Sequence, residues 1–302
     1  ELSDRVRRTL DRVRESGFDC HYEAQRQWLA TFWEHSDVSV GATPRIQQTI
    51  RWCIFQLAQA AARADGAGIP AKGLTGDGYE GHYFWDSEVY MVPFLTLTSP
   101  EQARNALRFR FTHLKDARER AREMSTKGAL FPWRTINGEE ASAYYAAGTA
   151  QYHIDADIAY AIGHYVAMTG DREFAYDEGA ELLVETARMW VDLGFWCVNA
   201  VENFEIHGVT GPDEYTTVVN NNTYTNVMAR WNLRLAIRMI RKLADEEPQA
   251  YQRLVHTVNL RDEEVANWER CANGMKIPFD ERLGIHPQDD AFVAKELWDL
   301  EN

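Results

Sequence analysis

Apolar residues recur along much of the chain at the three- and four-residue spacing of an amphipathic helix. The pattern is clear behind Thr43-Pro44, where the threonine can cap a helix and the proline can occupy its first turn. The apolar positions that follow are Ile46, Ile50, Cys53, Ile54 and Leu57. This spacing predicts a long buried helix.

Helix start signals recur further along the chain. Ser99 stands three residues before Gln102, as in a capping box, and Asp171 opens an apolar run that extends through Trp190. Another long helix is expected after Asn222, with one apolar face formed by Leu233, Ile237 and Ile240. These signals predict a mostly helical protein.

Long connections rich in glycine and aromatic residues separate the expected helices, at 70–90, 125–150, 195–222 and 272–290. Loops of this length in a compact domain usually carry binding or catalytic residues. No charge block or proline-rich linker divides the chain. We therefore expect one domain of paired helices with its loops gathered over one end, and a short strand near 203–208.

Composition narrows the classes of function. The 302 residues carry a formal net charge of −14, which argues against binding nucleic-acid phosphates. No apolar stretch approaches the roughly 20 residues that span a bilayer, and the first residues have no signal-peptide character. The four scattered cysteines are expected to be reduced, which favours a cytoplasmic location.

The segment 208–215, Gly-Val-Thr-Gly-Pro-Asp-Glu-Tyr, presents an acid from a shaped loop. Gly211-Pro212 fixes a turn, so Glu214 is a candidate general acid. The same spacing also allows Asp213 and Glu214 merely to cap the following helix, and both interpretations stay open.

The segment 76–88 combines four acids, one histidine and four aromatic residues. Aromatic rings stack on the apolar face of a pyranose and carboxylates accept from its hydroxyls, so Trp85 with Asp86 is typical of a sugar pocket. The alternative is that these aromatic residues and His82 belong to the core. Asp77-Gly78 matches part of a calcium loop, but the other ligand positions are not filled, so we expect no metal site.

Two further loops could complete the pocket. One contains Trp133 within 131–140 and continues to Tyr144-Tyr145 and the segment 151–155, Gln-Tyr-His-Ile-Asp. The other, 284–290, contains His286 and Asp289. Either loop could instead serve packing alone. The chain has no phosphate-binding GxxxxGK[ST], GxSxG, HExxH or GxGxxG motif of the kind that marks other enzyme classes.

Several of these motifs, in this order, resemble those of glycoside hydrolase family 65, a family of inverting disaccharide phosphorylases and hydrolases. The matching segments are Tyr83-Phe-Trp-Asp-Ser-Glu88, Gly128-Ala-Leu-Phe-Pro-Trp133, Gly211-Pro-Asp-Glu-Tyr215, Val219-Asn-Asn-Asn222 and Gly284-Ile-His-Pro-Gln-Asp-Asp290. The resemblance extends over nearly the whole chain.

The resemblance implies an all-α fold, an (α/α)6 barrel that is incomplete at the C-terminal end of this chain. It implies a single catalytic domain over 1–302, with linker-type helices over 1–40 and barrel helices and active-site loops over 41–302. Glu214 becomes the general acid, Trp85 and Asp86 hold the transferred glucose, and Trp133 lies toward the leaving sugar. The substrate-binding set is Trp85, Asp86, Glu88, Trp133, Arg134, Glu139, Glu140, Tyr215 and Asn222.

The implied reaction is inverting phosphorolysis of an α-glucosidic disaccharide to β-glucose 1-phosphate and a free sugar. It needs inorganic phosphate as co-substrate and no metal or organic cofactor. The expected partners are the disaccharide and phosphate, with neither nucleic acid nor membrane, and a homodimer of the intact enzyme stays open. Two alternatives remain. The first is a trehalose- or kojibiose-cleaving hydrolase of the family, which stays open because the family's phosphate-binding residues lie beyond the equivalent of Asp299. The second is a non-catalytic carbohydrate-binding protein.

Overall fold

The structure, a computed structural model, describes residues 2–62, 66–142, 145–198, 202–296 and 299. Contacts within the chain divide it into two compact units, Glu1–Ala58 and Gln59–Asn302. Helices dominate the described residues, which contain two short strands, so the all-α prediction is confirmed. The predicted domain division, with leading helices over 1–40 and a barrel from 41, stays a prediction.

The first unit contains α1 (Leu2–Ser36) and most of α2 (Pro44–Ala61). α2 begins at the predicted proline, but the prediction that its apolar face is buried is wrong at two of its five positions. Ile54 is buried, whereas Ile46 and Cys53 are exposed. Within a unit of two helices, too few neighbouring side chains are available to cover the whole face.

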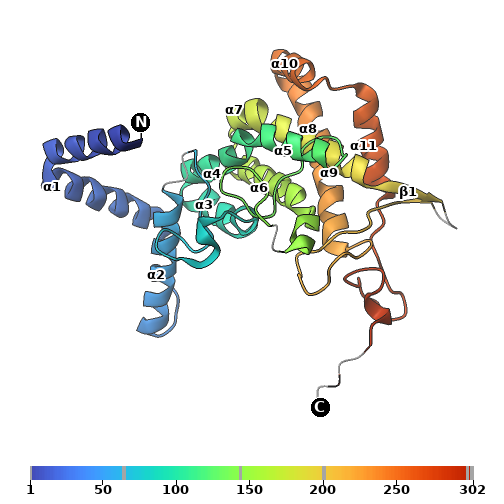
Figure 1. The fold of residues 1–302 in the computed structure, drawn as a ribbon, viewed down its shortest axis with the longest axis horizontal. Coiled ribbons are helices and arrows are strands. Elements are labelled where there is room, and N and C mark those ends of the chain that lie inside the picture. The colour runs from blue at the N-terminus through green and yellow to red at the C-terminus, as the bar shows by residue number, and fades with distance from the viewer. Residues whose placement is uncertain (1, 63–65, 143–144, 199–201, 297–298, 300–302) are drawn as a thin grey trace. The chain divides into compact units, whose positions relative to one another are not determined.

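The second unit carries the remaining helices (Figure 1). The α-helices are α3 (Val92–Thr98), α4 (Pro100–Thr112), α5 (Leu114–Glu123), α6 (His153–Thr169), α7 (Arg172–Phe174), α8 (Ala180–Leu193), α9 (Thr223–Glu246), α10 (Pro248–Val258) and α11 (Asp262–Gly274). Shorter turns are the 3-10 helices η1 (Gly78–Gly81), η3 (Ala146–Ala150) and η5 (Phe292–Ala294), and the π-helices η2 (Ser87–Met91) and η4 (Ala175–Gly179).

Helix α9 packs against α6, α8, α10 and α11, and α6 also contacts α3 and α4. The two strands, β1 (Phe195–Val198) and β2 (Glu202–Glu205), pair antiparallel. The predicted short strand near 203–208 is thus found, a little earlier in the chain. No described helix is long and apolar enough to cross a membrane.

Helix starts agree with the sequence where a side chain caps the backbone. Asn222 Oδ1 accepts from the backbone N–H of Thr225 at 3.0 Å, which starts α9. Asp171 caps α7 in the same way, but the π-turn η4 interrupts the predicted run before α8 begins. The predicted capping box at Ser99 is wrong, because the Ser99 side chain makes no cap bond and its backbone carbonyl accepts from Gln102 instead.

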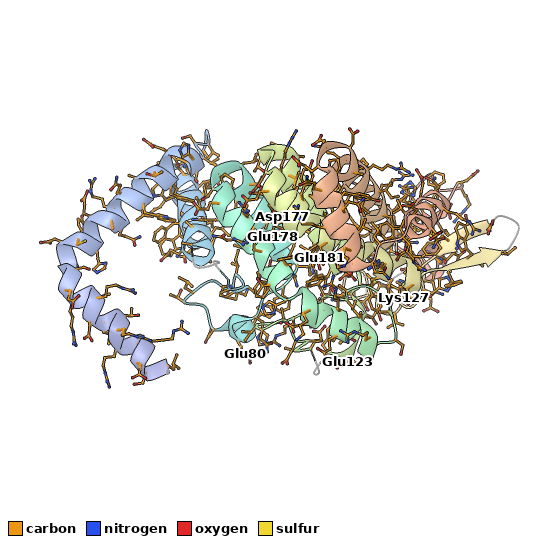
Figure 2. All side chains as sticks on the ribbon, turned by 90° about the horizontal axis from the view of Figure 1, so that it is seen from above. Glu80, Glu123, Lys127, Asp177, Glu178 and Glu181 are labelled. Carbon is orange, nitrogen blue, oxygen red and sulfur yellow. The ribbon has the colours of Figure 1, made fainter. Side chains whose placement is uncertain are left out.

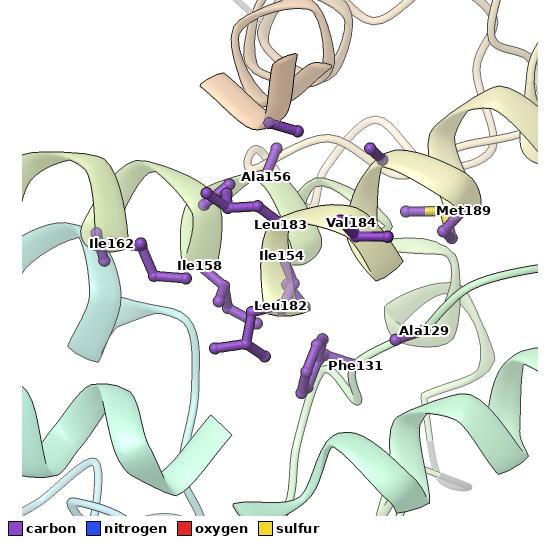
Figure 3. Packing of buried hydrophobic residues seen from close by; sticks show 14 of the residues in the cluster. Ala129, Phe131, Ile154, Ala156, Ile158, Ile162, Leu182, Leu183, Val184 and Met189 are labelled. Carbon is purple, nitrogen blue, oxygen red and sulfur yellow. The ribbon is translucent and has the colours of Figure 1, made fainter. Parts of the chain in front are cut away.

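The core of this unit forms where α6 and α8 meet the segment 129–131 (Figure 3). Ile154, Ile158 and Leu182 are at most 1% exposed, and Phe131 of the adjoining loop packs with them. Burying each such side chain stabilises the fold by about 1.5–3 kcal/mol. The core therefore anchors the loop that leads directly to Trp133.

Charged side chains connect helices of the second unit, and two of them, Glu178 and Glu181, are labelled in Figure 2. Glu178 of η4 pairs with Arg108 of α4 at 3.0 Å, and Glu181 of α8 pairs with Arg118 of α5 at 2.7 Å. The residues of these two pairs are 70 and 63 positions apart in the sequence. They help to hold the helical frame around the loops.

Candidate active site

A cavity of about 580 Å³ in the second unit is lined by residues from three regions of the chain, 71–91, 133–145 and 212–214. Its volume lies in the range of small-molecule binding sites. Trp85, Asp86, Trp133 and Glu214, which the sequence singled out from three separate loops, all line it. The structure therefore brings these four predicted site residues together.

Glu214 lies in a loop whose base is closed by a bridge between Val209 and Val219, with N···O distances of 2.9 and 2.8 Å. The Gln151 side-chain Nε2 donates to Glu214 Oε1 at 2.8 Å, and the Tyr145 hydroxyl donates to the Glu214 backbone carbonyl at 3.2 Å. The capping alternative is wrong, because the following helix, α9, is capped by Asn222. Two hydrogen bonds thus hold Glu214 in place at the wall of the cavity.

Trp85 and Asp86 precede the π-turn η2. The Trp85 ring meets the His153 ring edge to face at 4.9 Å between centroids. Asp86 is accessible from the cavity, yet surrounding atoms partly desolvate it and raise its pKa, and the negative charges of Glu214 and Asp157 add to this rise. Asp86 is therefore a strong acceptor for a hydroxyl that replaces water.

Trp133 is 7% exposed and contacts the rings of Phe84 and Tyr145 at 5.4 and 5.5 Å. The backbone N–H groups of Trp133 and Arg134 donate to the two oxygens of Glu140 at 2.9 and 3.2 Å. Glu140 thus shapes the Trp133 loop, and an ion pair with Arg120 at 2.8 Å holds it there.

Arg134 is 7% exposed, and its Nη2 pairs with Glu80 Oε2 at 2.7 Å. The same nitrogen donates to the Tyr79 backbone carbonyl at 3.4 Å. Tyr79 lines the cavity, so the bond from Arg134 to the Tyr79 carbonyl connects the Trp133 loop to the cavity wall.

Six of the nine predicted substrate-binding residues do not line the cavity: Arg134 and Glu140, described above, and Glu88, Asn222, Tyr215 and Glu139. Glu88 is buried in an ion pair with Arg110 at 2.6 Å, and Asn222 is the buried cap of α9. Tyr215 is fully exposed next to Glu214. Glu88 and Asn222 therefore support the elements that carry the site.

Glu139, also predicted to bind substrate, lines a separate hollow of about 590 Å³ together with Glu140, Glu119 and Glu123. The amide of Asn137 donates to the Glu139 carboxylate at 3.0 Å. The structure thus places Glu139 beside the Trp133 loop but not in the cavity that Glu214 lines.

The loop at 284–290 packs against α9 and the Glu214 loop. His286 Nδ1 lies 2.6 Å from the Pro278 carbonyl, and Asp289 is buried and pairs with Lys295 at 3.3 Å. Gln288 Nε2 donates to Asp213 at 2.7 Å, and this bond lowers the pKa of Asp213. This loop holds the neighbour of Glu214 in place.

Lys72, Tyr79, Met91 and Tyr145 also line the cavity. Tyr79 and Tyr145 belong to two of the segments expected to form the pocket, whereas no sequence signal marks Lys72 and Met91, which stand outside the recognised motifs. Tyr145 lies beside the noted Tyr144, which is outside the described residues. A lysine among these residues gives the cavity a cation beside Asp86 and Glu214.

Within the part of the chain that the structure describes, one group outside the cavity has metal-ligand chemistry: Glu205, His207 and Asp290 bring potential ligand atoms within 4.8 Å of one another. The Lys276 ammonium lies 3.2 Å from Glu205 and 3.3 Å from Asp290. The lysine therefore already supplies the positive charge that these carboxylates need.

Comparison with known proteins gives consistent results. The family model of the glycosyl hydrolase family 65 central catalytic domain matches residues 51–302. An alpha,alpha-trehalose phosphorylase of Thermoanaerobacter brockii is 48% identical over 287 residues, which cover 95% of this chain and 37% of that protein. A kojibiose phosphorylase of Halothermothrix orenii is 34% identical over 307 residues, covering 97% of this chain and 39% of that protein.

A solved structure from the human microbiome, provisionally named a kojibiose phosphorylase, superposes with a TM-score of 0.88 at 30% identity. The match covers 100% of this chain and 40% of that one. It agrees with the predicted (α/α)6 barrel. The chain thus spans little more than a third of the length of the curated relatives, 37% for the Thermoanaerobacter brockii protein.

Proposed function

The chain belongs to glycosyl hydrolase family 65, and on that premise we propose that it carries the active site of a glycoside phosphorylase acting on an α-glucosidic disaccharide. Both curated relatives described above are disaccharide phosphorylases by name. The observation that carries the proposal is the single cavity lined by Glu214, Trp85, Asp86 and Trp133. It combines a carboxyl with the aromatic and acidic groups that bind sugars.

We assign Glu214 as the general acid. Its loop position, its exposure to the cavity and its hydrogen bond from Gln151 support this role. The Trp85 ring and the Asp86 carboxylate hold the glucose that is transferred, and Trp133 contacts the leaving sugar. Glu140 and Arg134 keep the Trp133 loop in shape.

In the proposed reaction, a phosphate oxygen attacks the anomeric carbon from the face opposite the leaving sugar. The glycosidic bond breaks, its electron pair moves to the glycosidic oxygen, and that oxygen takes the proton of Glu214. The products are β-glucose 1-phosphate and a free sugar, and the Glu214 carboxylate regains a proton from solvent before the next turnover. Phosphate takes the place of the base and water that an inverting hydrolase needs.

Alpha,alpha-trehalose is the proposed substrate. The trehalose phosphorylase is 48% identical to this chain, and the kojibiose phosphorylase is 34% identical at similar coverage. The proposal is tested with the full-length protein on trehalose and kojibiose, with and without inorganic phosphate. We expect trehalose to be consumed only with phosphate and to give β-glucose 1-phosphate, as read by NMR of the anomeric proton. Release of two glucose molecules without phosphate would instead establish a hydrolase, and no cleavage of either sugar would contradict the proposal.

A further inference from the structure

Gln151 lies just before α6 and connects Glu214 to the buried interior. Its side chain is 2% exposed, and both ends of its amide are engaged. Nε2 donates to Glu214 Oε1 at 2.8 Å, and Oε1 lies 3.2 Å from His153 Nε2. The amide therefore spans from a cavity carboxyl to a core histidine.

The interior partners fix which way this amide points. His153 Nδ1 lies 2.6 Å from Asp157 Oδ2, and the Tyr224 hydroxyl donates to Asp157 Oδ1 at 2.7 Å. The Gln151 carbonyl oxygen faces His153 Nε2, and because a carbonyl oxygen only accepts, this pairing requires the hydrogen of that ring nitrogen. A ring nitrogen that donates cannot also accept from the amide, so the NH2 group of Gln151 faces Glu214.

This chain of hydrogen-bonded side chains has little freedom to rearrange. His153 and Asp157 are fully buried, and the His153 ring is packed by Trp85 and Tyr224 with centroids 4.9 and 5.5 Å away. Flipping the Gln151 amide would place its NH2 group against the Nε2–H of His153, so that two donors would face each other. Each unmet buried polar contact costs about 1–3 kcal/mol.

This arrangement distinguishes the two oxygens of Glu214. Oε1 receives an N–H from Gln151, so a proton on Oε1 would compete with that donor. Among the described residues, no protein group bonds to Oε2. The acid proton is therefore directed to Oε2, the oxygen left available to a ligand.

We propose that Gln151 is a positioning residue that restricts the transferable proton of Glu214 to Oε2, and that His153, Asp157 and Tyr224 fix the direction of its amide. This inference rests on the proposed function of Glu214 as general acid. Because Trp85 packs on His153, the same buried chain also connects the glucose-binding ring to the acid. These contacts therefore fix the position of the Trp85 ring relative to the proton donor, Glu214.

The test is a double-mutant cycle in the full-length protein with Gln151→Met, which keeps the length of the side chain and removes its hydrogen bonds. We expect kcat on the disaccharide to fall about 10- to 100-fold, the effect of losing one hydrogen bond to a charged group, with KM little changed. The loss on α-glucosyl fluoride, which needs less protonation to leave, should be much smaller. In a Glu214→Gln background, Gln151→Met should cause almost no further loss, because there is no proton to direct.

Gln102→Met on α4 is the matched control, since Gln102 is nearly buried and outside the cavity, and it should leave kcat unchanged. Tyr224→Phe is a second variant that keeps its ring and removes only the hydroxyl at the far end of the chain. It should show a smaller loss with the same dependence on leaving group and on Glu214, whether or not Gln151→Met folds.

Equal losses on both substrates, or losses that add fully to that of Glu214→Gln, would overturn the inference and make Gln151 a purely structural residue. Failure of the proposed function is distinguishable, because in that case Glu214→Gln alone would leave disaccharide turnover unchanged.

Discussion

Asp86 and Glu214 line the same cavity but are held differently. Glu214 is fixed by bonds from Gln151 and Tyr145, whereas burial and the neighbouring charges of Glu214 and Asp157 raise the pKa of Asp86. A sugar hydroxyl that donates to Asp86 stabilises its ionised form. Substrate binding and the charge of Asp86 therefore support each other.

Replacing Asp86 with alanine removes this acceptor. We expect kcat/KM for the disaccharide to fall by a factor of about 10 to 150, equivalent to the loss of about 1.5–3 kcal/mol for a hydrogen bond to a charged group. Steady-state kinetics of the folded full-length variant measures this. Asp262→Ala, an exposed acid in the first turn of α11, is the control. Wild-type kinetics for Asp86→Ala would remove this residue from the sugar site.

Asp155 is a buried acid that gives the fold a dependence on pH. Burial raises the pKa of Asp155 from its ordinary 3.8 to about 8, although Oδ1 accepts from the Phe131 N–H at 2.9 Å. Between these pH values the folded protein keeps a proton that the unfolded chain releases. The contribution of Asp155 to stability is therefore full below about pH 4 and is lost as the pH rises toward 8.

Asp155→Asn keeps the acceptor for the Phe131 N–H and removes this titration. We expect the variant to lose less thermal stability than the wild type between about pH 5 and about pH 8. Thermal melts of both proteins at the two pH values measure the difference. An identical fall in melting temperature would show that Asp155 is not the titrating group.

Some site residues could be chosen from sequence and others could not. Trp85, Asp86 and Glu214 stand in loops with turn residues and aromatic neighbours, and such surroundings indicate a binding function. Glu88 belongs to the same motif, but its partner Arg110 is 22 positions away, and a sequence does not show such a pairing. Lys72 carries no local signal at all and reaches the cavity through the path of its loop.

At the scale of elements, a buried ion pair joins η2 to α4. Arg110 donates to both Glu88 oxygens at 2.6 and 3.2 Å, and the Tyr83 hydroxyl donates to Oε1 at 2.7 Å. The Arg110 guanidinium also lies 4.6 Å from the Tyr83 ring centre. Because η2 follows Asp86 directly, this pair fixes the turn next to Trp85 and Asp86, the proposed sugar-binding residues.

Glu88→Gln leaves the Arg110 charge buried without its counter-ion. We expect the free energy of unfolding to fall by about 3–5 kcal/mol, the usual cost of breaking a buried pair by removing one partner. Glu269→Gln on α11 breaks an exposed pair with Arg241 and should cost no more than about 1 kcal/mol. Chemical denaturation of both variants makes the comparison, and equal effects would contradict the structural role of Glu88.

Helix boundaries follow the sequence where their cause is local. Asn222 caps α9 through its own side chain, so residue type and spacing sufficed to predict the start. Ser99 has the same spacing signal, yet its side chain makes no cap bond. The exposed positions Ile46 and Cys53 of the α2 face differ from the prediction for another reason, since burial depends on which other elements pack against the helix.

At the scale of the whole molecule, helical periodicity and loop motifs together were enough to predict the fold class and the family. Each motif alone is weak, but five in order over nearly the whole chain are specific, and the family match over 51–302 agrees with them. If Trp133 contacts the leaving sugar as proposed, the choice of disaccharide depends on the exact shape of that side of the cavity. Tyr145 and Tyr79 contribute to that shape, and a sequence pattern does not specify how their rings are arranged.

The central claim is that Glu214 donates the proton to the leaving sugar, and Glu214→Gln in the full-length protein tests it most directly. The amide keeps the shape of the side chain but has no proton to donate. We expect kcat on the natural disaccharide to fall about 10²- to 10⁴-fold, the usual effect of losing general acid catalysis, with substrate affinity little changed. Turnover of α-glucosyl fluoride, whose leaving group needs less protonation, should be largely retained. Near-wild-type turnover of the disaccharide, or equal losses on both substrates, would contradict the assignment.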